Sequence, residues 1–135
     1  MSHPLLSADL STDTPLPTLQ VDPISRTTLA LFAGASNDHN PIHIDLDNAR
    51  SAGLADVFAH GMLSMAYLSR YLLRLAPQDR LQRFSTRFVS ITPVHGAPTC
   101  SAVVTSVTDG HVEVGLTVTL ADGTVTLEGT ARFAR

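Results

Sequence analysis

The sequence contains no lysine and only one cysteine, Cys100. A single cysteine cannot form an intramolecular disulfide, which fits a reducing compartment, and we therefore expect a cytoplasmic protein. Because there is no run of about 18 apolar residues, no transmembrane helix is predicted. Residues 1–18 have neither the basic residues nor the apolar run of a signal peptide. All nine basic residues are arginine and the formal net charge is −3, so charge gives no reason to expect nucleic acid as a partner.

The composition predicts one globular domain. The chain has 135 residues, of which 44% are hydrophobic and 16% are charged, which is enough apolar material for a core. Residues 1–15 are rich in serine, threonine, aspartate and proline, and we expect them to form a loose N-terminal arm. Residues 16–135 would then be the single folded domain.

The first half of the chain is typical of helices. Ser25 is a candidate N-cap for a short helix over Thr27–Ala35, and Asp45 or Asp47 could cap a second one that ends by Gly53. The longest helix is predicted over Met62–Leu75, before Pro77. Its apolar residues cover almost the whole circumference, which predicts a helix that is buried on several sides.

The second half alternates between apolar and polar residues, as strands do. A short strand is possible over Leu16–Val21. Longer strands are predicted over Gln82–Thr92, Thr99–Val107, 112–120 and 125–133. The pairs Asp109-Gly110 and Asp122-Gly123 favour tight hairpin turns, which predicts an antiparallel meander. The fold class is therefore α+β, with an antiparallel sheet wrapped around one long helix.

The stretch from Asp38 to His43 is the least ordinary part of the sequence. Pro41 lies between these two residues and is incompatible with a regular helix, so a bend is predicted that could point both side chains into one pocket. An imidazole exchanges protons near neutral pH, and a carboxylate can act as a base or anchor a water molecule. The same residues are also compatible with a turn cap and a structural histidine, and composition alone favours that simpler interpretation.

Gly61 is expected at the N-terminus of the long helix. Free backbone N–H groups and the positive end of the helix dipole lie there, and a glycine allows a ligand to approach closely. A carbonyl oxygen bound at this point would be stabilised as it gains negative charge. Alternatively, Gly61 only makes a tight turn into the helix.

Two motifs together resemble the MaoC-like hydratase/dehydratase family, which includes (R)-specific enoyl-CoA hydratases. They are Asn37-Asp38-His39-Asn40-Pro41-Ile42-His43 and His60-Gly61-Met62-Leu63. Arg87-Phe88, Pro93-Val94 and Gly96 are similar to the family's next strand and turn, and the resemblance runs from about Leu16 to the C-terminus. One position departs from the family pattern, because Asn37 stands where a glycine usually precedes the aspartate. Asparagine tolerates the left-handed conformation best among other residues, so we expect the bend to persist.

The resemblance implies a hot-dog fold and reversible addition of water to trans-2-enoyl thioesters, giving (R)-3-hydroxyacyl thioesters. It implies that Asp38 and His43 are the catalytic pair and that the Gly61 N–H binds the thioester oxygen. Asn40 would brace the bend, and Ser69 matches a position that is often polar in the family. No cofactor is implied beyond the coenzyme A or acyl-carrier pantetheine of the substrate.

Several alternatives remain open at the level of sequence. The chain could be a non-catalytic hot-dog subunit that binds acyl thioesters or stabilises a partner, or a thioesterase, which would leave the motif unexplained. A metal site at His39 and His43 is disfavoured by Pro41, and His60, His95 and His111 are assigned to the surface or to structural roles. A group of arginines could bind coenzyme A phosphates or an acyl-carrier protein, or could simply be solvated (Arg70, Arg74, Arg80, Arg83 and Arg87). Because one hot-dog unit exposes a sheet face, we predict a dimer, either a homodimer or a heterodimer with a related subunit.

Overall fold

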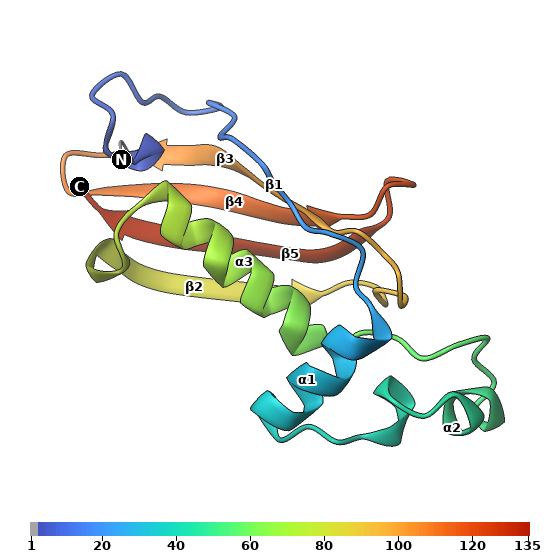
Figure 1. The fold of residues 1–135 in the computed structure, drawn as a ribbon. Coiled ribbons are helices and arrows are strands. Elements are labelled where there is room, and N and C mark those ends of the chain that lie inside the picture. The colour runs from blue at the N-terminus through green and yellow to red at the C-terminus, as the bar shows by residue number, and fades with distance from the viewer. Residues whose placement is uncertain (1–2) are drawn as a thin grey trace.

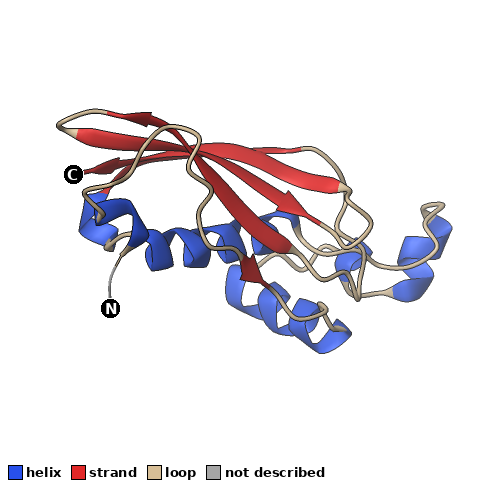
Figure 2. Ribbon diagram, turned by 90° about the horizontal axis from the view of Figure 1, so that it is seen from above, coloured by secondary structure: helices blue, strands red, loops and turns tan. Residues whose placement is uncertain are grey.

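A computed structural model describes residues 3–135 of the chain. Five antiparallel strands form one sheet in the order β1-β3-β4-β5-β2, and the helices lie on one side of it (Figures 1 and 2). The strands are β1 Leu19–Gln20, β2 Leu81–Phe88, β3 Thr99–Val107, β4 His111–Thr119 and β5 Val125–Ala134. The helices are α1 Arg26–Ser36, α2 Leu46–Ser51 and α3 Gly61–Leu75, with short 3₁₀ turns at Pro4–Leu6, Pro41–His43 and Gln78–Arg80.

Strands β3, β4 and β5 form the predicted meander. Gly123 has a φ of 86°, and glycine adopts such positive values readily in a tight turn. The Thr124 N–H donates to Asp122 Oδ1 at 2.9 Å. Strand β2 comes directly after the long helix but pairs with β5, which makes it an edge strand. It ends at Phe88 rather than at the predicted Thr92, because the next two N–H groups both donate to Thr126 O and the ladder stops there.

Helix α3 crosses the middle of the sheet and supplies the main core (Figure 1). Leu68, Leu72 and Leu75 are almost completely buried against residues of the sheet. The expectation that this helix is buried on several sides is wrong for the isolated chain, since Met62 is 54% and Leu73 is 44% exposed. The sheet covers one side of α3 only, so Met62 and Leu73 remain exposed beside Arg70 and Arg74 on the other.

A second, smaller core holds α1 and α2 beside the beginning of α3. It joins Leu29 of α1, Ala49 of α2 and Leu63 of α3 with apolar residues of the connecting loops. The predicted cap of α1 is confirmed, since Ser25 Oγ accepts from the Thr28 N–H at 3.0 Å. This core fixes the loop after α1 close to the N-terminus of α3.

The N-terminal segment is ordered along the edge of the sheet, and the expectation of a loose arm over residues 1–15 is not met where the structure describes it. Leu5 is 1% exposed and belongs to the main core. The Asp13 N–H donates to Val104 O at 2.8 Å and the Leu16 N–H donates to Ala102 O at 3.0 Å. These contacts anchor the segment on β3, so the composition was a poor guide; residues 1–2 lie outside the described part.

None of the helices within residues 3–135 is long and apolar enough to cross a membrane.

Candidate active site

The loop between α1 and α2 makes the predicted bend. Helix α1 ends at Ser36, and its C-cap Asn37 has a φ of 59°, the left-handed conformation that asparagine tolerates. The Asn40 N–H then donates to Asp38 Oδ1 at 3.2 Å, and the Ile42 N–H donates to Asn40 Oδ1 at 3.2 Å. The Asn40 and Asp38 side chains thus each accept a backbone N–H within the bend.

His43 is held by the backbone of a distant segment. Its side chain is buried, with 8% exposed, and Nδ1 lies 2.7 Å from Phe58 O. Because a carbonyl oxygen can only accept, Nδ1 must carry the hydrogen, which leaves the lone pair on Nε2. The Phe58 ring contacts the imidazole edge-on, with centroids 4.8 Å apart. His43 is thus oriented with Nδ1 towards the Phe58 carbonyl, which leaves Nε2 available for another partner.

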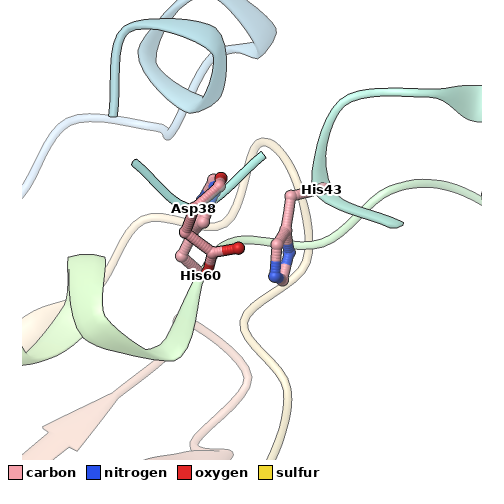
Figure 3. Close-up of side chains that lie close together, drawn as sticks. All are labelled: Asp38, His43 and His60. Carbon is pink, nitrogen blue, oxygen red and sulfur yellow. The ribbon is translucent and has the colours of Figure 1, made fainter. Parts of the chain in front are cut away.

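His60 is a third member of the site, and the sequence analysis did not assign it there. It is 1% exposed, its Nε2 lies 3.0 Å from Asp38 O, and its ring stacks on His43 with centroids 4.0 Å apart. One possible ligand atom from each of Asp38, His43 and His60 lies within 4.8 Å of the others. Figure 3 shows these three side chains close together. The signal that could have identified His60 is its position directly before Gly61.

The structure groups other residues than those of the metal site considered from the sequence. His39 is exposed and is not part of the compact group, which consists of Asp38, His43 and His60. One nitrogen of each imidazole already pairs with a carbonyl oxygen. A metal ion would therefore have to use the other nitrogens or displace these hydrogen bonds, whereas a water molecule can use the free Nε2 of His43 as it is.

Gly61 begins α3 and lines a pocket next to this group. As the first helical residue, it has no intrahelical acceptor for its N–H. A Cβ at this position would lie 3.0 Å from the Phe88 ring, so glycine keeps the approach to the backbone open. The pocket has a volume of about 230 Å³ and is mostly apolar, with lining residues Phe58, Ala59, Gly61, Ser64, Phe88, Val89, Ser90, Ile91, Thr92 and Leu127.

Phe58 connects the pocket to the imidazole, because its side chain and backbone contact His43 while it also lines the pocket. Ser64 is the serine of α3 that reaches this pocket, where its Oγ lies 3.3 Å from Thr92 Oγ1. Ser69 is half-buried and is not among the lining residues. It lies about 12 Å further along the helix than Gly61.

Charged groups around the site are mostly engaged with neighbours. Two hydrogen bonds of 2.9 and 2.6 Å join Arg26 and Asp56, and the guanidinium holds the pKa of the Asp56 carboxyl below its usual range. Among the arginines considered for phosphate binding, Arg87 pairs with Glu128 at 2.8 Å, and Arg70 lies over the Tyr67 ring. Phosphate binding by this group of arginines stays a prediction.

The five-stranded antiparallel sheet with one long helix across its face is the hot-dog fold. The MaoC like domain family matches residues 9–125 of the chain. The chain therefore belongs to the MaoC-like domain family.

Named relatives agree with this assignment. The chain is 34% identical over 82 residues to the (R)-specific enoyl-CoA hydratase of Rhodospirillum rubrum, a match that covers 61% of this chain and 57% of that protein. The chain thus spans little more than half the length of this curated relative. The (R)-hydratase from A. caviae superimposes with a TM-score of 0.82 at 21% identity, covering 94% of this chain and 98% of that one. The ChsH1-ChsH2 complex from Mycobacterium tuberculosis gives a TM-score of 0.80 at 22% identity, covering 92% and 97% of the two chains.

Proposed function

We propose that this protein adds water reversibly to trans-2-enoyl thioesters and forms (R)-3-hydroxyacyl thioesters. The observation that carries the proposal is the compact group of Asp38, His43 and His60. Gly61 follows His60 directly in the sequence and lines an apolar pocket that Phe58, a contact of His43, also lines. The family membership and the name of the Rhodospirillum rubrum relative support the same reaction. The acyl chain length and the choice between coenzyme A and a carrier protein are left to experiment.

The reaction needs one water molecule held between Asp38 and His43. Asp38 accepts a proton from this water while the oxygen attacks C3 of the enoyl group, and the electrons move to the thioester oxygen. The Gly61 N–H stabilises that oxygen as it becomes negative. As the enolate collapses, the proton that Asp38 took from the water is passed to C2, with His43 positioning the water and assisting that transfer, so both residues return to their starting states.

We propose that a second hot-dog subunit covers the pocket. Three side chains at the end of β2 and in the next loop, Phe88, Val89 and Ile91, are 52%, 46% and 52% exposed, and Met62 at the start of α3 is 54% exposed. Exposed apolar groups gathered around one site are typical of an interface. A second copy of this chain is the simplest occupant, and a related chain is the alternative, since one structural relative is a complex of ChsH1 with ChsH2. Sedimentation analysis of the purified chain distinguishes a dimer from a monomer.

The reaction is tested by hydration of trans-2-enoyl thioesters of several chain lengths, carried on coenzyme A and on acyl-carrier protein, with chiral analysis of the product. We expect the (R)-3-hydroxyacyl product, and a loss of at least about 10²-fold in kcat for Asp38→Asn and for His43→Gln, the lower end of what acid–base groups contribute. Asp47→Asn changes an exposed carboxylate outside the three-residue group and serves as the control.

Folded protein that turns over neither kind of thioester would refute the proposal. The non-catalytic subunit would then be favoured, and mixing the chain with a catalytic hot-dog protein and measuring complex formation would test it.

A further inference from the structure

We propose that His60 is a positioning residue. It fixes the position of the loop that carries Asp38 and His43 relative to the N-terminus of α3, where the thioester oxygen would bind. The inference rests on the hydration proposed above and adds a residue to it. His60 does not need to touch the substrate in this role. It acts through Asp38 and His43, both of which it contacts directly.

The hydrogen bond of His60 fixes its own tautomer. Its partner is the carbonyl oxygen of Asp38, which can only accept, so Nε2 carries the hydrogen. The other nitrogen, Nδ1, is buried and has no hydrogen-bond partner among the described residues. Buried polar groups are normally paired, and a hydrophobic residue of similar size would have avoided this unpaired atom. A histidine at this place therefore indicates that the Nε2 bond and the ring shape have a purpose.

The contacts of His60 join segments that are distant in sequence. Its backbone is the N-cap of α3, next to Gly61, and its side chain reaches Asp38, 22 residues away. Its ring lies between Phe32, at 5.0 Å edge-on, and His43, at 4.0 Å in a stack. The ring thereby sets the spacing between the acid–base pair and the start of the helix.

This spacing matters because one small substrate must contact the acid–base pair and the Gly61 N–H at the same time. The water must reach C3 while the thioester oxygen, two carbons away, meets the Gly61 N–H. A displacement of about 1 Å between catalytic groups can cost about 10²-fold in rate. The Asp38 side chain is exposed and receives one hydrogen bond, from the Asn40 N–H, so its position depends on the backbone that His60 holds.

The test uses three substitutions that separate the hydrogen bond from the volume of the ring. His60→Phe keeps an aromatic ring but cannot donate. His60→Gln places an amide N–H near the position of Nε2, whereas the shorter His60→Asn reaches only the position of Nδ1. The kcat and KM of each purified variant are measured with a trans-2-enoyl-CoA that the wild type hydrates, and thermal unfolding reports whether each one is folded.

We expect a fall of about 10²-fold in kcat for His60→Phe and His60→Asn, with KM within about threefold of the wild type because substrate contacts remain. His60→Gln should recover kcat to within about fivefold of the wild type, since it restores the bond to the Asp38 carbonyl. His111→Phe, the same change on the β3–β4 hairpin, is the control and should keep the wild-type kcat.

The role of His60 would be overturned if folded His60→Phe kept a wild-type kcat. If His60→Phe fails to fold, His60→Gln is compared with His60→Asn. An equal kcat in these two variants overturns the role, and a much higher kcat in His60→Gln supports it. These outcomes differ from failure of the proposed function, because an inactive wild type would remove the hydration reaction itself and, with it, this role of His60.

Discussion

Replacing Gly61 with alanine should separate the stability of the protein from its activity. The new Cβ would lie 3.0 and 3.1 Å from two atoms of the Phe88 ring. That ring belongs to a side chain that is 52% exposed, so it can rotate away at a cost of about 1 kcal/mol or less. Alanine also gains about 0.4–1 kcal/mol over glycine where the backbone conformation suits it. The two effects nearly cancel, and we expect the melting temperature to change by no more than a few degrees.

The effect on catalysis should be much larger. In the proposed mechanism the thioester oxygen approaches the Gly61 N–H directly, and the added methyl group together with the displaced Phe88 ring narrows that approach. Alanine keeps the backbone N–H, so the cost comes from displacing the thioester oxygen, and a displacement of about 1 Å between catalytic groups can cost about 10²-fold in rate. We expect a fall of about 10²-fold in kcat/KM for Gly61→Ala, which corresponds to about 2.7 kcal/mol of lost transition-state stabilisation.

The assay is steady-state hydration of a trans-2-enoyl-CoA, measured beside thermal unfolding of the same samples. Gly34→Ala is a matched control, since Gly34 lies in α1 and a Cβ there would meet nothing within 4 Å; this variant should be slightly more stable and equally active. The double substitution Gly61→Ala/Phe88→Ala tests the crowding, and it should recover part of kcat/KM if the ring is what blocks the approach. A Gly61→Ala protein within threefold of the wild-type kcat/KM would refute the direct approach of the thioester to this helix end.

Three further predictions follow from single contacts. Asn40→Ala removes the acceptor for the Ile42 N–H, and we expect about 1 kcal/mol less stability together with at least tenfold lower kcat, measured by unfolding and by hydration kinetics. Asn37→Gly relieves the left-handed conformation at φ 59° and should raise the melting temperature by about 2–4 °C; no rise would show that asparagine adds a compensating contact. Burial raises the pKa of the Cys100 thiol from 9.0 to about 11, so its contribution to stability is complete below pH 9 and is lost as the pH rises towards 11. Between about pH 8 and 11 the unfolding free energy of Cys100→Ala should therefore fall by about 2 kcal/mol less than that of the wild type, and equal losses in both proteins would contradict this.

Much of the fold was predictable because local chemistry and tertiary structure agree. The alternating pattern and the Asp-Gly turn gave the meander, and Ser25 gave the start of α1, as the hydrogen bonds confirm. Where the prediction was wrong, long-range contacts decided. The end of β2 depends on Thr126 across the sheet, and the N-terminal segment is ordered by β3 rather than by its own composition. Neither partner can be identified from the segment itself.

The site was predictable in its two motifs but not in the way they are connected. Pro41 and Asn37 indicate a bend from their intrinsic preferences, and Gly61 indicates an open helix end. The connection uses two backbone carbonyls, those of Phe58 and Asp38, which fix the tautomers of the two imidazoles. Almost any residue type can provide a carbonyl, so no side-chain motif reveals these contacts.

This use of the backbone explains why His60 is central in the structure and inconspicuous in the sequence. A buried histidine without a carboxylate partner is usually structural, and its neighbour Gly61 supplies the more recognisable chemical signal. The fold brings the Asp38 carbonyl to His60 only because the small core of α1, α2 and Leu63 places the loop against the start of α3. The packing of that core therefore controls the geometry of the site. A cavity made there, for example by Leu29→Ala, should lower kcat as well as stability. Leu29 itself is neither in the three-residue group nor in the lining of the pocket.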